Sequence, residues 1–176
     1  YRLVRNATAR TLAGLMVQSF EKAFDADLRA AATAVNFTVR EAVTMASLVE
    51  EEAQIADERP IISAVYHNRL KIGMGLQCDA TVIYAMQRAG TWNGNIRRVD
   101  LQMDSPYNTY RYRGLPPGPI ANPGRASIEA AVRPASVPYL YYVSRNDGSH
   151  AFATTLDEHN RNVQQYQIQY FRDRRN

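Results

Sequence analysis

The stretch MASLVEEEAQ, residues 45–54, places three consecutive glutamates at the end of an apolar run. If these residues form a helix, each step turns the chain by about 100°, so Glu52, seven residues after Met45, lies only about 20° away from it. Glu50 and Glu51 fall on other sides of the helix and are predicted to face solvent. The pattern therefore puts one carboxylate, that of Glu52, on the apolar face.

A carboxylate on the apolar face of a helix has three explanations. The helix end can emerge from the core at that point, or an arginine such as Arg59 or Arg69 can pair with Glu52 inside the protein. Alternatively, Glu52 is a partly desolvated acid in a cleft, where burial raises its pKa because it disfavours the charged form. Such an acid could donate and accept a proton near neutral pH. The three explanations differ in what they place around the carboxylate: water, a guanidinium group or a cleft.

Periodic apolar residues and helix-end signals surround this stretch on both sides. Four helices are predicted before residue 104, over residues 8–31, 38–56, 57–73 and 79–90. The second of them opens on TVRE, residues 38–41, which matches a capping box. Asp79 is predicted to cap the fourth helix and Gly90 to end it.

The second half of the chain is predicted to contain an irregular segment and a hairpin in addition to helices. Residues 104–124 are dense in proline, glycine, tyrosine and asparagine, and so long an irregular segment in a compact domain is usually functional or disordered. The tyrosines in this segment argue against disorder. A short helix is predicted over residues 125–133. It is followed by a hairpin in which residues 139–143 and 150–153 pair around an NDGS turn. A last helix is predicted over residues 156–172.

Length and composition fit one α+β domain over residues 1–176, a helical body with a small antiparallel sheet. The net charge of +4 and the pI of about 9.3 favour polyanions, but basic and aromatic residues do not interleave as in nucleic-acid-binding proteins. Cys78 is the single cysteine and the three histidines lack metal-ligand spacing, so no disulfide, metal site or cofactor is predicted. No segment approaches the roughly 18 apolar residues of a membrane-spanning helix.

Glycoside hydrolysis normally uses two carboxylates, and this sequence offers one well-placed acid. Four other acids could partner Glu52, but none has a convincing position: Glu58, Asp79, Asp104 and Asp147. Glu58 lies beyond a predicted helix break, Asp79 is a predicted helix cap, and the other two lie in predicted turns. One acid together with a tyrosine-rich segment suggests a reaction that needs no second carboxylate.

Several long motifs resemble the catalytic domain of the endolytic murein transglycosylases, the MltG or YceG-like family. The matching runs are ASLVEEEAQIADERPIISAVYHNRLKIGMGLQCDATVIYA at residues 46–85, YNTYRYRGLPPGPIANPG at 107–124, RPA at 133–135, YLYYV at 139–143 and HAFATTLDEHN at 150–160. Their order and spacing hold over about two-thirds of the chain. The resemblance implies a lysozyme-like helical region that carries the catalytic glutamate, the last residue of the family's V-E-x-E motif. In this sequence that residue is Glu52.

The resemblance also implies a reaction. Family members are lyases that cleave the β-1,4 bond between N-acetylmuramic acid and N-acetylglucosamine inside peptidoglycan strands. The 6-hydroxyl of the sugar itself attacks the anomeric carbon and leaves a 1,6-anhydro end, so no second carboxylate is needed. Glu52 is expected to protonate the leaving oxygen and then to take the proton of the 6-hydroxyl. The alternatives are a muramidase that uses water and a peptidoglycan-binding module without catalytic activity.

The family motifs further imply a set of residues that bind the glycan. These are Gln77, Asp79, Thr81, Tyr84, Tyr107, Asn108, Thr109, Tyr110, Asn122, His150 and Asn160. Tyrosine rings suit stacking on sugar faces, and amides suit N-acetyl and hydroxyl groups. A structural hydrogen-bonding role is the stronger interpretation for His150 and Asn160. Many members carry Thr or Ser where this chain has Cys78, a change that is expected to be harmless.

A cellular setting also follows from the resemblance. Full-length members have one N-terminal membrane helix and a small wall-binding-like subdomain, and both are expected to precede this sequence. The catalytic part is expected to face the periplasm or the outer side of the cell membrane, and the present chain to be soluble by itself. Peptidoglycan strands are the expected partner and the glycan-polymerising machinery is a second candidate, whereas no nucleic acid is expected.

Overall fold

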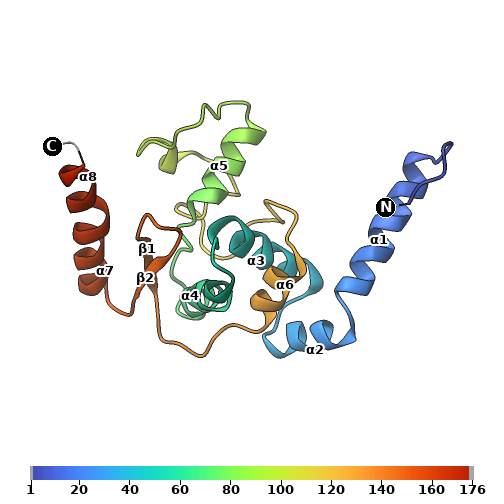
Figure 1. The fold of residues 1–176 in the computed structure, drawn as a ribbon, viewed down its shortest axis with the longest axis horizontal. Coiled ribbons are helices and arrows are strands. Elements are labelled where there is room, and N and C mark those ends of the chain that lie inside the picture. The colour runs from blue at the N-terminus through green and yellow to red at the C-terminus, as the bar shows by residue number, and fades with distance from the viewer. Residues whose placement is uncertain (1, 175–176) are drawn as a thin grey trace.

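The structure, a computed structural model, describes residues 2–174. Its α-helices are α1 (Ala9–Ala23), α2 (Ala26–Ala34), α3 (Val39–Glu52), α4 (Arg59–Lys71), α5 (Asp79–Arg88), α6 (Arg125–Val132), α7 (Leu156–Val163) and α8 (Tyr170–Asp173). The strands β1 (Tyr141–Ser144) and β2 (His150–Ala153) form an antiparallel sheet, and the shorter helical segments are η1 (Ala56–Glu58), η2 (Asp100–Gln102) and the π-helical η3 (Gln164–Gln169). The predicted α+β class is confirmed (Figure 1). Within residues 2–174, no helix has both the length and the apolar composition needed to cross a lipid bilayer.

The hydrophobic core is centred on α3, which packs against α6 and α4. Met45 and Leu48 of α3 are fully shielded from solvent, as the helical pattern predicted. Tyr66 of α4 and Ile128 of α6 belong to the same apolar cluster. Phe24, which lies just before α2, is also part of it. Full burial of one such side chain contributes about 1.5–3 kcal/mol to stability. Figure 1 shows these helices together in the middle of the molecule, with α3 packed against α4 and α6.

Both ends of α3 are determined locally. At its start, Thr38 Oγ1 accepts a hydrogen bond from the backbone N–H of Glu41 at 3.2 Å, and Glu41 Oε2 accepts one from the N–H of Thr38 at 2.8 Å. This is the predicted capping box. At its end, Ala53 takes an extended conformation, with φ −86° and ψ 111°, so the helix stops at Glu52 and not at the predicted residue 56. The side chain of Glu52 therefore projects from the last turn of α3.

The first predicted helix, over residues 8–31, is wrong as a single element. It divides into α1 and α2 because Asp25 begins a new helix, its Oδ1 accepting from the backbone N–H of Leu28 at 3.0 Å. Phe24, just before the break, turns into the core and is fully buried. No residue of α1 is buried, and Figure 1 shows this helix extending away from the body of the protein. The apolar stripe of α1 thus contributes little to the core.

Glu50 departs from the prediction that it faces solvent. Its Oε2 accepts hydrogen bonds from the backbone N–H of Gly124 at 3.1 Å and from the hydroxyl of Ser127 at 2.5 Å. Gly124 is the N-cap of α6, so this carboxylate accepts from the N–H of the N-cap residue and places a negative charge at the start of the helix. A helical wheel could not show the contact, because the partner lies 74 residues further along the chain. Glu51 is exposed, as predicted.

Replacing Glu50 with alanine is expected to lower the free energy of unfolding by about 2 kcal/mol. The substitution leaves the N–H at the start of α6 without its acceptor and removes the carboxylate that the buried Ser127 hydroxyl contacts. Urea denaturation followed by circular dichroism measures the change. Glu51→Ala is the matched control, and its effect should stay within about 0.5 kcal/mol. Equal effects of the two substitutions would contradict the capping role.

The small sheet and the C-terminal helices form one side of the molecule, on the opposite side of the body from α1 (Figure 1). Ser144 pairs with His150 next to the turn, in which Asn146 and Gly148 have φ angles of 65° and 90°. Asparagine and glycine tolerate this left-handed region best. The predicted helix over residues 156–172 is helical along its length but contains η3 in its middle. Because α7 packs against both strands, the hairpin is fixed relative to the C-terminal helices.

Candidate active site

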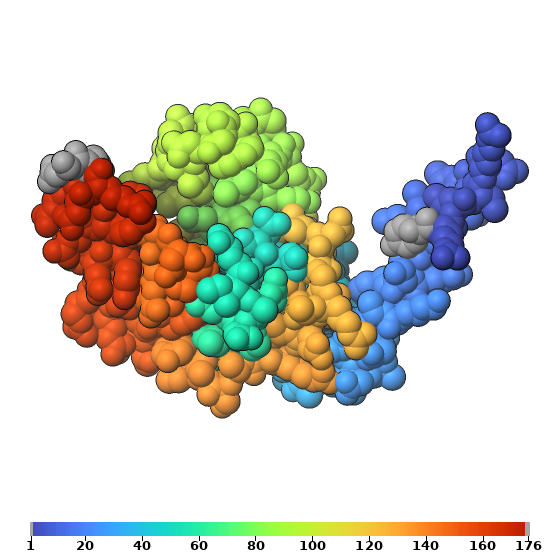
Figure 2. Space-filling model, viewed as in Figure 1, coloured from blue at the N-terminus to red at the C-terminus, as the bar shows by residue number. Residues whose placement is uncertain are grey.

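A cavity of about 440 Å³ opens beside the end of α3. Its wall is formed by side chains from α3, α4, the start of α5 and the segment before it, residues 104–124, the hairpin, and the C-terminal helices. They are Glu52, Arg69, Leu76, Gln77, Asp79, Tyr110, Tyr142, Val143, Ser144, His150, His159 and Gln167. Figure 2 shows the surface hollowed between the lobe that contains α5, in green, and the C-terminal helices, in red.

Glu52 is half-buried in this wall. The thiol of Cys78 donates a hydrogen bond to its Oε1 at 3.2 Å. The two candidate arginines bind elsewhere: Arg59 Nε donates to the hydroxyl of Ser127 at 3.3 Å, and Arg69 donates to backbone carbonyls. The explanation by a buried arginine pair is therefore wrong, and the surroundings of Glu52 are those of an acid in a cleft.

The surroundings also raise the pKa of Glu52 above its usual value of 4.5. Burial contributes most because it disfavours the carboxylate, and the negative charge of Asp79 acts in the same direction. The hydrogen bond from the thiol of Cys78 lowers the pKa of Glu52, but it does not offset burial. Glu52 can therefore keep its proton at a pH where exposed glutamates are ionised.

Replacing Cys78 with alanine is expected to raise the pKa of Glu52 further. The thiol stabilises the carboxylate by donating to Oε1, and alanine removes this donor. NMR titration of isotope-labelled glutamate carboxyl groups measures the change. Cys78→Ser keeps a donor at the same position and serves as the control, with a pKa of Glu52 closer to that of the unaltered protein. A fall in the pKa of Glu52 in the alanine variant would show that the thiol does not act in this way.

The segment that leads into α5 is held in place by the tyrosine-rich segment, residues 104–124. Gln77 has a φ of 51°, and its N–H donates to the carbonyl of Thr109 at 3.2 Å. The N–H of Cys78 donates to Thr109 Oγ1 at 3.0 Å, and the hydroxyls of Thr109 and Thr81 lie 2.9 Å apart. These bonds fix the thiol of Cys78 and, through it, the carboxylate of Glu52.

Asp79 does not cap α5, contrary to the prediction. The N-cap is Cys78, and no side chain caps this end of the helix. Asp79 Oδ1 instead accepts a hydrogen bond from the hydroxyl of Tyr110 at 2.5 Å, and both side chains line the cavity. Burial and the nearby Asp79 carboxylate raise the pKa of Tyr110, so its phenol stays protonated. Local capping rules missed this contact because Tyr110 comes from a segment 31 residues away.

A family sequence model matches almost the whole chain: the model of the YceG-like family covers residues 1–165. The chain belongs to the YceG-like family. The endolytic murein transglycosylase of Bacillus subtilis is 47% identical over 129 residues, which are 73% of this chain and 35% of that protein. The protein of the same name from Streptococcus pneumoniae serotype 2 is 36% identical over 135 residues, 74% of this chain and 24% of that protein. The chain thus spans about a third or less of the length of these relatives.

A solved structure of a YceG-like protein supports the fold. The crystal structure of a putative yceG-like protein from Listeria monocytogenes matches with a TM-score of 0.79 and 37% sequence identity. The match covers 92% of this chain and 50% of that chain. Most of this chain therefore has the same fold as that YceG-like protein.

Five predicted site residues of this YceG-like chain share the cavity wall: Glu52, Gln77, Asp79, Tyr110 and His150. They come from α3, the segment that leads into α5, the first residue of α5, the tyrosine-rich segment and β2. Since Gln77 and Asp79 are neighbours, four separate segments contribute polar side chains to one cavity, and a few polar groups that converge on a cavity are typical of a ligand site. Their roles in catalysis and binding stay predictions.

Three other predicted site residues lie beneath the wall and are buried: Thr81, Asn108 and Thr109. Asn108 Nδ2 donates to the carbonyls of Leu101 at 3.0 Å and Met103 at 2.8 Å, and its Oδ1 accepts from the N–H of Tyr110 at 3.0 Å. The two threonine hydroxyls bond to each other. Because these groups bond within the protein, they support the wall, and a direct contact with a bound glycan is not expected of them.

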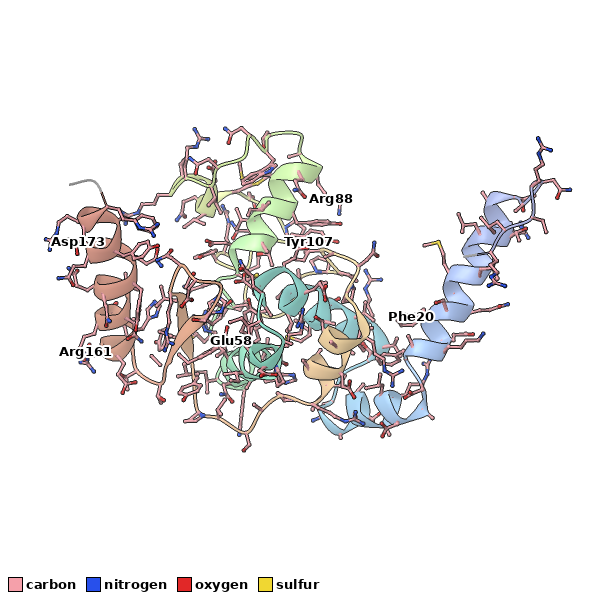
Figure 3. All side chains as sticks on the ribbon, in the orientation of Figure 1. Phe20, Glu58, Arg88, Tyr107, Arg161 and Asp173 are labelled. Atoms are coloured by element: carbon pink, nitrogen blue, oxygen red, sulfur yellow. The ribbon has the colours of Figure 1, made fainter. Side chains whose placement is uncertain are left out.

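The remaining predicted site residues lie away from the cavity. The rings of Tyr84 and Tyr107 pack at 4.8 Å, and the guanidinium group of Arg88 lies 5.3 Å from the ring of Tyr107 (Figure 3). This cluster stabilises the lobe that contains α5. Asn122 and Asn160 are exposed, and neither lines the cavity.

Sequence reasoning missed the side of the cavity that the hairpin and the C-terminal helices provide. Tyr142 and Ser144 line it from β1, and His159 and Gln167 line it from α7 and η3. Arg69, which is only 7% exposed, lines it while donating to the carbonyls of residues 140, 75 and 76. His159 lies within the EHN run at residues 158–160, but no local pattern places its ring next to Glu52.

Proposed function

We propose that this chain is the catalytic domain, over residues 1–176, of a lytic transglycosylase that cleaves the β-1,4 bond between N-acetylmuramic acid and N-acetylglucosamine within peptidoglycan. One observation carries the proposal. Glu52, which the resemblance matches to the last glutamate of the family motif, lines the cavity, and its pKa is raised. Within residues 2–174, no arginine pairs with it. Membership of the YceG-like family and the names of the curated relatives support the substrate and the reaction class.

In the proposed mechanism, protonated Glu52 gives its proton to the glycosidic oxygen as the bond from that oxygen to the anomeric carbon breaks. The N-acetyl group of the sugar can stabilise the cationic centre. The 6-hydroxyl of the same sugar then forms a bond to the anomeric carbon. Its proton passes to the carboxylate of Glu52, which restores the starting state. Product release leaves a 1,6-anhydro end, and no water is consumed.

The arrangement of the other acids supports this mechanism over hydrolysis. Both carboxylate oxygens of Glu58 bond to His150, Asp104 accepts from the hydroxyl of Tyr112 at 2.6 Å, and Asp147 accepts from Ser149. In the described part of the chain, Asp79 is the other carboxylate that lines the cavity, and it is already bonded to Tyr110. Asp79 is nevertheless the group that a muramidase would use to activate water, so the hydrolytic alternative predicts a role for it.

Analysis of the products distinguishes the two reactions. Purified peptidoglycan is digested with the protein, and the muropeptides are separated and weighed by mass spectrometry. The proposal predicts new ends that are one water lighter than the reducing ends that hydrolysis produces. Reducing ends that disappear in Asp79→Asn would favour the muramidase. Binding to peptidoglycan without any cleavage would favour the non-catalytic module.

We further propose that the parent protein acts on the outer side of the cytoplasmic membrane, where peptidoglycan lies. The names of the curated relatives support this setting, and the net charge of +4 suits an anionic wall. Peptidoglycan strands are the proposed partner. An N-terminal membrane anchor and an association with the glycan-polymerising machinery are proposals that rest on the family resemblance.

A further inference from the structure

Glu58 and His150 form a pair that the proposed mechanism does not use. Glu58 is the last residue of η1, and His150 is the first residue of β2, 92 residues later. The backbone N–H of His150 donates to Glu58 Oε1 at 3.0 Å, and its ring nitrogen Nδ1 lies 2.7 Å from Glu58 Oε2. The two side chains are only 10% and 13% exposed. Glu58 is labelled near the centre of the view in Figure 3.

The carboxylate determines which ring nitrogen of His150 carries the hydrogen. A carboxylate can only accept, so Nδ1 must be the donor, and in the neutral ring Nε2 is then an acceptor. Within residues 2–174, Nε2 makes no hydrogen bond. It is also not one of the fully buried polar atoms that lack a partner, so part of its surface is accessible. Because His150 lines the cavity and Nε2 is the ring nitrogen that Glu58 leaves free, we infer that this acceptor is available to a ligand in the cavity.

The ring is also held in one orientation. Tyr142 packs against it in a T-shaped contact, with ring centroids 5.3 Å apart and planes at 87°, and the ring centroid of Phe152 lies 6.2 Å away. Tyr142 itself is positioned by a 2.7 Å hydrogen bond between its hydroxyl and that of Tyr66. A fixed acceptor in the same wall as Glu52 complements the chemistry of a glycan, whose hydroxyl groups are hydrogen-bond donors.

We propose that His150 Nε2 accepts a hydrogen bond from a hydroxyl group of the glycan bound in this cavity, and that Glu58 is the positioning residue that keeps Nε2 an acceptor. The inference rests on the proposed function, because the bound group is taken to be a sugar. From the sequence alone, Glu58 is a candidate only as a second carboxylate beside Glu52. In this proposal Glu58 affects glycan binding indirectly, because it determines which nitrogen of His150 accepts the hydrogen bond. It transfers no proton to or from the glycan.

Glu58→Gln tests the pair because it changes the direction of one hydrogen bond and little else. The amide oxygen can still accept from the backbone N–H of His150, but the amide nitrogen then faces Nδ1 as a donor. The ring must move its hydrogen to Nε2, which presents a donor to the cavity. Nitrogen NMR of labelled histidine is expected to show hydrogen on Nδ1 in the unaltered protein and on Nε2 in the variant.

The functional readout is affinity for a chitin tetrasaccharide, measured by calorimetry on the Glu52→Gln protein so that the sugar is not cleaved. Adding Glu58→Gln is expected to weaken binding about tenfold, which corresponds to about 1.4 kcal/mol. Glu51→Gln is the matched control at an exposed position and should leave the affinity unchanged. A changed tautomer with affinity within twofold of the parent protein would overturn the proposal and leave Glu58 a structural role only. Hydrogen on Nε2, or on both ring nitrogens, in the unaltered protein would also overturn it.

His150→Asn provides a second test that does not depend on the folding of the Glu58 variant. The asparagine amide reaches only the position of Nδ1, so the contact with Glu58 can remain while the acceptor in the cavity is lost. In the Glu52→Gln protein, His150→Asn is expected to weaken binding of the chitin tetrasaccharide about tenfold. Unchanged affinity would contradict the proposal. Failure of the proposed function is separable: if peptidoglycan is not cleaved but both variants weaken sugar binding, the pair stands and the transglycosylase reaction does not.

Discussion

Glu52→Gln is expected to lower the rate of 1,6-anhydro product formation by about 10³-fold, in the middle of the range that a general acid–base group contributes. Glutamine has nearly the same shape and can still accept from the thiol of Cys78, but it can neither protonate the glycosidic oxygen nor take the proton of the 6-hydroxyl. Single-turnover digestion of peptidoglycan with mass-spectrometric detection measures the loss. Glu51→Gln, an identical substitution on the exposed neighbour, should leave the rate unchanged.

The same substitution is expected to stabilise the protein at neutral pH. Burial raises the pKa of Glu52 above 4.5, so the folded state binds this proton more tightly than the unfolded state does. Stability is therefore lost as the pH rises from about 4.5 through the pKa of the folded state, and glutamine does not incur that loss. The gain in the free energy of unfolding should vanish near pH 4 and grow above it. A variant that loses activity because it unfolds would show the opposite change, so thermal unfolding at two pH values separates the two causes.

The sequence could predict what local rules determine. The capping box at Thr38 depends on residues three apart, and the burial of Met45 depends on helical periodicity, so both were visible before the fold was known. The position of Glu52 on the apolar face followed in the same way. The resemblance then brought together residues as distant as Gln77 and His150, which periodicity alone could not have joined.

Contacts between distant segments account for what was predicted incorrectly. Glu50 looked like a solvent-facing charge until Gly124 and Ser127 were placed against it. Asp79 looked like a helix cap because the phenol of Tyr110 could not be foreseen as its partner. In both cases a carboxylate satisfies a donor that becomes its neighbour only when the chain folds, and no local pattern contains that information.

Asn108 illustrates the same limit at a predicted binding residue, and Asn108→Ala is expected to lower the free energy of unfolding by about 3 kcal/mol. The side chain is 0% exposed, and its amide bonds to the carbonyls of Leu101 and Met103 and to the N–H of Tyr110. Alanine leaves these three backbone groups without their partner. Each group that no water molecule reaches lowers the free energy of unfolding by about 1–3 kcal/mol. Urea denaturation gives the change, and Asn122→Ala, at an exposed asparagine of the same irregular region, should stay within about 0.5 kcal/mol.

The consequence of Asn108→Ala for activity follows from what Asn108 holds. Its Oδ1 positions the backbone of Tyr110, whose hydroxyl bonds to Asp79 in the cavity wall, and the adjoining Thr109 holds the N–H of Cys78. Loosening this segment should therefore lower kcat/KM and free the thiol that bonds to Glu52, so activity and stability fall together. If Asn108 instead contacted the glycan, its loss would weaken sugar binding at unchanged stability. Chemical denaturation and calorimetry on one protein sample distinguish the structural role from a direct contact with the glycan, because only the structural role lowers the free energy of unfolding.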